Sequence, residues 1–239
     1  MSDENNEDES KVVPISAAAR RVLGVLVEKA KTTPDNYPLS LAGLITGCNQ
    51  KSNRSPKMEV DEGDVLAALV ELREVGAARE VQGNGRVTKY RHAAYDWMDL
   101  DSPQAAVMTE LLLRGPQTAG EIRTRASRMS PLADMTAAQD VLDQLITKEL
   151  VESLTPPGRG QTFAHKLYTP DERQYLEARI EKQAAAAPSP KKSLAEVDKL
   201  LQRLDSVNER IDQLEERIKN LEALGGQPAK QSTSGSSSS

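Results

Sequence analysis

Basic residues interleaved with amides are the side chains here whose types and spacing suggest chemistry. The insertion at residues 49–57 carries Lys51, Arg54 and Lys57, with Asn53 among them, and residues 49–54 are polar throughout. Arginine and lysine bind phosphate oxygens, and an amide beside arginine can read the edges of bases. The alternative is a solvated surface whose charges pair with the abundant acidic residues. The stretch is too polar for a loop that merely packs, and it therefore favours contact with nucleic acid.

Further candidate phosphate contacts follow two predicted hairpins and one short helix. They are Arg86, Lys89, Arg91, Arg123, Arg125, Arg128, Arg159 and Lys166. For the hairpin residues, phosphate binding and simple solvation of the surface are equally compatible with the pattern.

Other chemistry finds little support. Cys48 follows an apolar helical face, which predicts a buried structural thiol rather than a nucleophile. One cysteine and two histidines, His92 and His165, without a recognised ligand spacing argue against a metal site. Neither a phosphate-binding GxxxxGK[ST] loop nor an H-x-E motif occurs. The sequence therefore predicts a protein that is not an enzyme and carries no cofactor.

The elements that must position these residues repeat one order twice. In the first copy, helices follow Ser16 and Ser40, a third runs from about Asp61 to Val75, and a hairpin turns at residues 83–85. In the second copy, helices follow Ser102 and Thr118, a third runs from about Asp134 to Leu150, and a hairpin turns at 156–158. Three helices followed by a β-hairpin is the winged form of the helix-turn-helix.

The two third helices carry an unfavourable charge for DNA reading. Their periodicity places Leu66 and Ile146 on the inward faces, and the residues left for solvent are mostly acidic. These acids are Asp61, Glu62, Asp64, Glu71, Glu74, Asp134, Asp140, Asp143 and Glu149. Phosphates would repel such a helix, so wings and the 49–57 insertion are the better candidates for DNA contact.

Several runs in this part of the sequence resemble the YceH-like family of uncharacterised bacterial proteins. The matching runs are 37–40 (YPLS), 48–56 (CNQKSNRSP), 85–90 (GRVTKY), 111–115 (LLLRG) and 117–125. The resemblance covers roughly residues 15 to 168. It implies the same tandem winged-helix fold and adds no activity, because no established activity of the family can be carried over.

A heptad repeat follows the second copy. The positions a and d are filled by branched aliphatic residues: Val197, Leu200, Leu204, Val207, Ile211, Leu214, Ile218 and Leu221. Arg210 and Arg217 fall at g, and Glu215 and Glu222 at e. A parallel dimer pairs these opposite charges, whereas an antiparallel dimer brings like charges together. The pattern predicts a parallel homodimer, with a trimer left open by Leu201 at e and by the short length.

The whole chain has 239 residues and a formal charge of −5, and five of its acidic residues lie within residues 1–11. No apolar run reaches membrane-spanning length, and no secretory signal is present, so we expect a cytoplasmic protein with no membrane contact. The expected fold class is mainly α with small β-hairpins, comprising two tandem winged-helix domains and a C-terminal coiled coil. The expected segments are a disordered acidic tail (1–11), the first winged helix (12–98), the second with a trailing helix (99–183), a linker (184–192), the coiled coil (193–224) and a disordered tail (225–239).

Two functions remain. The first is a dimeric, DNA-binding or transcription-associated protein that uses its wings and insertion. The second is a protein-interaction module or scaffold with no direct nucleic-acid contact. The acidic third helices favour the second function and the basic segments favour the first, whose main support is analogy of fold.

Overall fold

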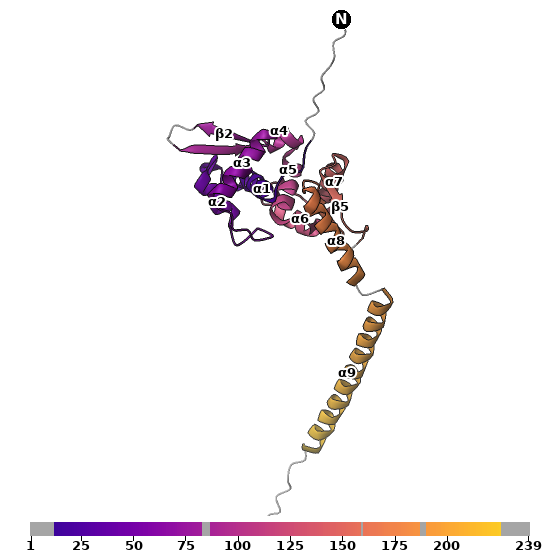
Figure 1. Cartoon of the computed structure of the whole chain (residues 1–239). Helices are drawn as coiled ribbons and strands as arrows, with labels where there is room; N and C mark the ends of the chain where they lie inside the picture. The colour runs from indigo at the N-terminus through magenta and orange to yellow at the C-terminus, as the bar shows by residue number, and fades with distance from the viewer. Residues whose placement is uncertain (1–11, 83–86, 159, 187–189, 226–239) are drawn as a thin grey trace, which may run out of the picture. The chain divides into compact units, whose positions relative to one another are not determined.

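The computed structural model describes residues 12–82, 87–158, 160–186 and 190–225. Its elements are mostly helices, with two small antiparallel sheets, which confirms the predicted mainly helical class (Figure 1). The two predicted tails and the first hairpin turn lie outside the described residues. No helix in the described part of the chain is both long and apolar enough to cross a membrane.

The first half contains four α-helices and three short strands. In chain order they are α1 (Ala17–Thr32), a 3-10 turn η1 (Pro34–Asn36), β1 (Leu39–Ser40), α2 (Leu41–Cys48), α3 (Glu62–Glu74), β2 (Ala78–Gln82), β3 (Thr88–His92) and α4 (Ala94–Met98). Ser16, Ser40 and Asp61 each begin a helix, because their side chains accept a hydrogen bond from a backbone N–H of the first turn.

The second half repeats the order of the first. It contains α5 (Ser102–Arg114), β4 (Gln117–Thr118), α6 (Ala119–Ala126), α7 (Met135–Thr147), β5 (Val151–Ser153) and β6 (Thr162–His165). Asp101, Thr118 and Asp134 cap its helices. The strand order β4-β6-β5 matches β1-β3-β2 in the first sheet. The periodicity missed the two-residue strand that completes each sheet, because so short a strand leaves no alternation to detect.

The two halves share a continuous hydrophobic core. Helix α1 packs directly on α5, and at this contact Gly24 allows a close approach. A Cβ atom at Gly24 would lie 2.8 Å from Cδ2 of Leu113, a side chain with no exposed surface. Because the core crosses from one half to the other, the chain up to Ile180 forms one compact unit. The predicted domain boundary at residues 98–99 stays a prediction.

Three side chains on the third helices differ from expectation. Leu66 on α3 is 40% exposed and Ile146 on α7 is 37% exposed, so neither faces the core as predicted. Both residues lie next to buried residues on their helices. The helix face that packs into the core is, however, narrower than the face on which the sequence places apolar residues. Glu71 also turns inward, where its carboxylate accepts hydrogen bonds from the backbone N–H and hydroxyl of Ser16.

Two helices follow the second sheet. Helix α8 spans Pro170–Ala186 and α9 spans Pro190–Gly225. Residues from Glu181 onward form the second unit, which contains α9. The predicted interruption near Pro188 lies at residues 187–189, outside the described residues.

Candidate nucleic-acid interface

The outer face of the first sheet carries three cations side by side. In the antiparallel pair β2–β3, Arg79 lies opposite Arg91 and Val81 lies opposite Lys89. Directly opposed residues point to the same face of a sheet, so Arg79, Lys89 and Arg91 share one face. All three are exposed. We call these three residues the wing cations.

Successive side chains of a strand point to opposite faces of the sheet, and this alternation determines which residues point outward. Tyr90, between Lys89 and Arg91, is buried at 8% exposure and packs into the core, which forces its two neighbours outward. Arg79 makes a loose contact of 3.8 Å with Asp96, and both side chains are more than half exposed. Lys89 and Arg91 form no ion pair with any described residue. Two of the three wing cations are thus available to an external anion.

The 49–57 insertion splits into an exposed part and a buried part. Lys51, Asn53 and Lys57 are exposed, as a phosphate contact requires. The side chain of Asn49 closes the insertion at its base, accepting a hydrogen bond from the Val60 N–H and donating one to the Val60 carbonyl. The described residues of the insertion contain no helix or strand, so hydrogen bonds of this kind hold its shape.

The prediction that Arg54 contacts phosphate is wrong in this structure. Its side chain has no exposed surface and donates to both carboxylate oxygens of Glu28, at 3.2 and 2.5 Å. It also donates to Gln50 and to the backbone carbonyls of Gly47 and Asn53. With its donors used inside the protein, Arg54 cannot contact a phosphate in this structure. A polar sequence context did not reveal this, because its main partner lies 26 residues away.

The second-half arginines are also engaged within the protein. Arg123 donates to the carbonyl of Ala133, and Arg125 donates to Gln117 and Glu121. Arg128 contacts Glu28 at 2.6 Å and Glu110 at 2.7 Å. Lys166 is half-buried. These four predicted contacts are therefore weaker candidates than the wing cations, and Arg86 and Arg159 lie outside the described residues.

A buried charge network joins the two halves of the compact unit. Glu28 on α1 and Glu110 on α5 are at most 1% exposed, and Arg128 bridges them. Arg54 completes the coordination of Glu28, and Arg114 pairs with Glu110 at 3.0 Å. Burial acts to raise the pKa of Glu28, but hydrogen bonds from Arg54 and Arg128 outweigh it and hold that pKa below its usual value. The network gives Arg54 and Arg128 a structural role.

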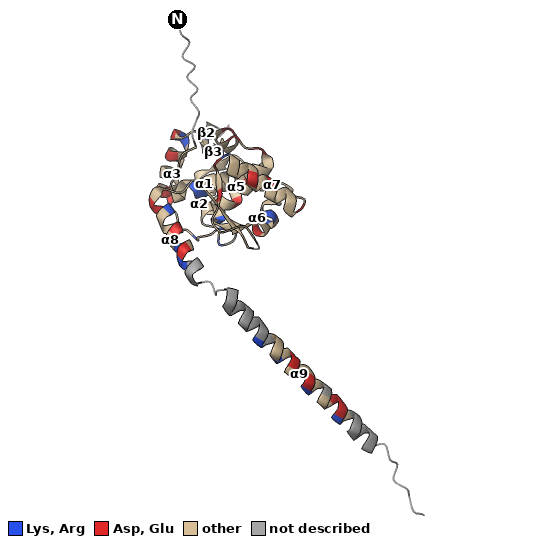
Figure 2. Cartoon of the chain, turned by 90° about the vertical axis from the view of Figure 1, so that its right-hand side faces the viewer, with Lys and Arg blue, Asp and Glu red and all other residues tan. Residues whose placement is uncertain are grey.

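The cysteine and the two histidines are mostly buried, and burial shifts their pKa values. Cys48 is buried, as expected, and burial raises the pKa of its thiol to about 11. Burial lowers the pKa of His92 to about 4 and that of His165 to about 3, so both rings are neutral near pH 7. On the face of the unit shown in Figure 2, acidic and basic residues alternate along α8.

The comparisons with known proteins place these features in a family. The profile described as a protein of unknown function, DUF480, matches residues 15–159. The chain belongs to this family. The match confirms the resemblance to the YceH-like family seen in the sequence.

Relatives of the DUF480 chain come from several bacteria. A UPF0502 protein of Rhodopirellula baltica is 69% identical over 192 residues, covering 80% of this chain and 81% of its own length. A UPF0502 protein of Geotalea uraniireducens is 49% identical, covering 64% and 73%, and one of Koribacter versatilis is 42% identical, covering 66% and 75%. The matched family range contains the wing cations and the buried charge network, and it ends before α8 and α9.

Proposed function

We propose that this chain is a dimeric DNA-binding protein in which each half is a winged helix and the outer face of the first sheet contacts the phosphate backbone of duplex DNA. The repeated order of three helices and a three-stranded sheet supports the winged-helix assignment. The alignment of the three wing cations on one exposed face carries the proposal. Their spacing along a strand suits successive phosphates, which dominate affinity for DNA.

Helix α3 is not the reading element in this proposal. Glu62, Leu66, Val70 and Glu74 follow one another at four-residue intervals, and all four are exposed. The exposed face of α3 is therefore acidic at both ends and apolar between them. Such a face would meet repulsion in the major groove, so the wing and the exposed lysines of the insertion supply the contacts.

Three double variants test where DNA binds. We expect Lys89→Ala with Arg91→Ala to weaken binding to duplex DNA about tenfold or more at low salt, because each change removes an unpaired cation. Lys51→Ala with Lys57→Ala measures the share of the insertion. The matched control, Lys182→Ala with Lys199→Ala, removes the same charge from two exposed lysines elsewhere. Fluorescence anisotropy with the intact chain measures all of these affinities.

Two results of this titration count against the proposal. An intact wild-type chain that binds no duplex at low salt would remove it. An equal loss in the wing variant and the control would show attraction by net charge alone, without a defined interface.

The proposed dimer forms through α9. Leu204, Val207, Ile211, Leu214 and Ile218 follow the heptad spacing on this helix, and each is 47–57% exposed in the single chain. A second copy of α9 in parallel would cover this stripe and place Arg210 beside Glu215. The side chains of Val197, Leu200 and Leu221, which extend the stripe in sequence, lie outside the described residues. A dimer would let two sets of wing cations act together on one duplex.

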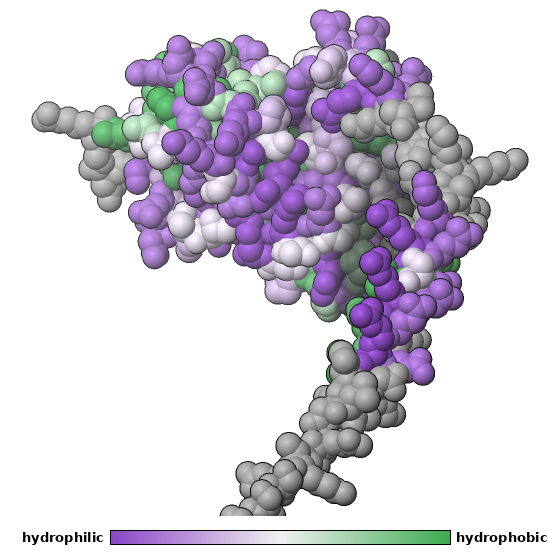
Figure 3. Space-filling model, turned by 90° about the horizontal axis from the view of Figure 1, so that it is seen from below, coloured by the Kyte–Doolittle hydropathy of each residue, from purple (hydrophilic) through white to green (hydrophobic). Residues whose placement is uncertain are grey.

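The exposed face of α3 favours a second candidate function, a protein-interaction module. Leu66 and Val70 form an apolar centre flanked by Glu62 and Glu74. A protein partner with basic residues around an apolar contact would complement this face. Hydrophobic residues also gather at the wing-bearing end of the surface seen in Figure 3. A pull-down with and without nuclease separates the two functions: partners that survive nuclease but are lost with Leu66→Ser support this one.

A further inference from the structure

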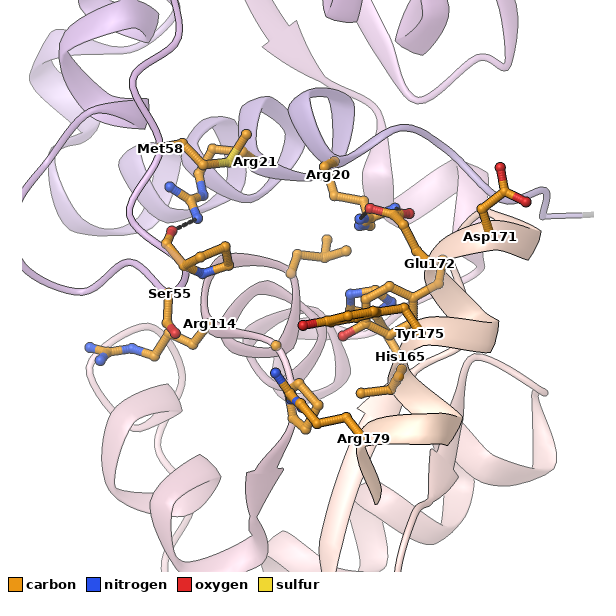
Figure 4. Close-up of a pocket in the computed structure, with 17 residues that line it drawn as sticks. Arg20, Arg21, Ser55, Met58, Arg114, His165, Asp171, Glu172, Tyr175 and Arg179 are labelled. Carbon is orange, nitrogen blue, oxygen red and sulfur yellow. Dashed lines mark hydrogen bonds and ion pairs between the residues drawn. The ribbon is translucent and has the colours of Figure 1, made fainter. Parts of the chain in front are cut away.

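A cavity lies between α1, the insertion, the end of α5 and α8. Its volume is about 700 Å³, within the range of roughly 300–1,000 Å³ typical of small-molecule sites. Apolar atoms of Met58, Leu112 and Leu176 form part of its wall. Figure 4 shows Tyr175 reaching from α8 across the cavity, with Arg20 and Arg21 on one side and Arg114 and Arg179 on the other. The cavity combines an apolar wall, an aromatic ring and several cations.

Arg21 is the unusual residue in this wall. It is 2% exposed, and it donates to two backbone carbonyls, those of Cys48 at 3.1 Å and Pro56 at 2.7 Å. Its Nε has no hydrogen-bond partner within the part of the chain that the structure describes. No described carboxylate forms an ion pair with it. A buried guanidinium without an opposing charge is costly, and burial accordingly lowers the pKa of Arg21.

The other two buried arginines show what Arg21 lacks. Arg20 is paired with both carboxylate oxygens of Glu172, at 2.8 and 2.5 Å. Arg54 is paired in the same way with Glu28. Of the three described buried arginines, Arg20 and Arg54 thus have a bidentate carboxylate and Arg21 has none.

The remaining charges around the cavity favour an anion. Arg114 is already engaged with Glu110, and Arg179 is exposed and forms no ion pair with a described residue. Of the two acids, Glu172 is neutralised by Arg20, and Asp171 points away from the cavity in Figure 4. His165 contributes no charge near pH 7. An anion entering the cavity would therefore meet Arg21 and Arg179, while the carboxylate of Asp171, which has no ion pair with a described residue, is turned outward from the lining.

We propose that this cavity binds a small organic anion whose phosphate or carboxylate group neutralises Arg21 and whose flat body lies against Tyr175. Tyr175, which lines the cavity from α8, is 72% exposed, so most of its ring is open to contact with a ligand. A ring stacked on it would cover this surface, while the anionic group replaces the carboxylate missing from Arg21. The site is separate from the wing cations, so the proposal does not depend on DNA binding.

Three probes test this site on the intact chain. AMP carries a phosphate and a planar base on one ribose, benzoate carries a carboxylate on a ring, and inorganic phosphate has no ring. We expect AMP or benzoate to bind with a Kd below about 1 mM and to raise the Tm, with the better of the two identifying the anionic group. Isothermal titration calorimetry gives the Kd.

Four variants assign the binding to the cavity. Arg21→Gln should weaken binding at least about tenfold, because it removes the charge but keeps a donor for the Pro56 carbonyl. Arg179→Ala and Tyr175→Ala change exposed side chains and should weaken binding without unfolding the chain, so they remain informative if Arg21→Gln does not fold. Arg73→Ala, which changes a half-exposed cation on α3 outside the cavity, is the matched control and should bind as the wild type does.

Three outcomes would overturn the inference. The first is that neither AMP nor benzoate binds to the wild type. The second is that the Arg73→Ala control loses as much affinity as the cavity variants. The third is that inorganic phosphate binds as tightly as both ringed probes and Tyr175→Ala has no effect.

Discussion

Glu28 and Glu110 are carboxylates enclosed by the core, and three arginines converge on them. Glu28 accepts hydrogen bonds from Arg54 and Arg128, and Glu110 accepts them from Arg114 and Arg128. Such a network is stable only while each charge keeps its partner, because a buried ion without one costs several kcal/mol. At the residue scale, the junction between the halves depends on this pairing.

Replacing Glu28 tests the network. We expect Glu28→Gln to lower the free energy of unfolding by about 3–5 kcal/mol, since it leaves the fully buried Arg54 side chain without its carboxylate. Urea denaturation measures the change. Glu80→Gln, which removes a half-exposed partner of Arg73, is the control and should cost less than about 1 kcal/mol. Equal effects of the two substitutions would contradict the role of the network.

The buried histidines predict a pH dependence of stability. Burial lowers the pKa of His165 to about 3, against 6.5 for a free histidine. Between these values the unfolded chain binds a proton that the folded chain does not, so the free energy of unfolding falls as pH falls below about 6.5. The slope is about 1.4 kcal/mol per pH unit for His165. His92, whose pKa burial lowers to about 4, contributes less to this slope because it is partly exposed.

Urea unfolding at stepped pH from 7 to 5 measures this slope. Above pH 5 the carboxylates contribute little, because the pKa values of Glu28 and Glu172 lie below 4.5. His165→Asn should flatten the slope while lowering stability overall. A variant with an unchanged slope would show that His165 is not the group that titrates.

At the element scale, the contact between α1 and α5 determines how the two halves meet. Gly47 allows a similarly close contact between α2 and α1 within the first half, because a Cβ atom at Gly47 would lie 2.6 Å from Val25 Cγ1. These glycines are required because the helices pack backbone against side chain, with no room for a methyl group. The position of the cavity and the buried charge network both follow from this close packing.

Gly24→Ala tests the close approach. We expect it to destabilise the protein by about 1–3 kcal/mol, because the new methyl group meets the fully buried Leu113 side chain. Gly120→Ala is the matched control: it adds a methyl group to exposed helix α6 with no atom within 4 Å. That control should be neutral or stabilising by up to about 1 kcal/mol. Thermal denaturation of both variants distinguishes packing from helix propensity.

The helices and hairpins could be predicted from the sequence, because their caps and periodicities are local. Ser16, Ser40 and Asp61 begin helices where the pattern placed them. The fate of the basic residues could not be predicted in the same way. Arg54 pairs with Glu28, which lies 26 residues away in the same half, and Arg128 meets Glu28 only where the two halves pack together. The strands that carry the cations could be recognised in the sequence. That Arg79 shares a face with Lys89 and Arg91 required the register of the strand pairing.

At the scale of the whole molecule, the proposal combines a compact unit bearing the wing cations with a helix that joins two copies. The acidic total of the chain, −5, does not oppose DNA binding, because five acids lie in residues 1–11. What matters is which face presents unpaired cations. Two copies joined through α9 would present that face twice, so weak phosphate contacts could add up to a useful affinity.

A charge reversal tests the orientation of the proposed dimer. Glu215→Arg with Glu222→Arg places arginine opposite Arg210 and Arg217 in a parallel pair, and should weaken the dimer about tenfold or more. In an antiparallel pair, position e faces position e, so the same change replaces Glu–Glu contacts by Arg–Arg contacts. The affinity would then stay close to that of the wild type. Glu209→Arg with Glu216→Arg makes the same charge change at the outer f positions and serves as the control. Analytical ultracentrifugation measures the dimer Kd.

The salt dependence of duplex binding tests the central claim most directly. The logarithm of the binding constant should fall linearly with the logarithm of salt concentration for the intact chain, with a slope set by the number of phosphates neutralised. We predict that Lys89→Ala with Arg91→Ala reduces this slope by about one unit for each cation that touches a phosphate, while Lys182→Ala with Lys199→Ala leaves it unchanged. Identical slopes for the wild type and the wing variant would contradict the assignment of the first sheet as the DNA-binding face.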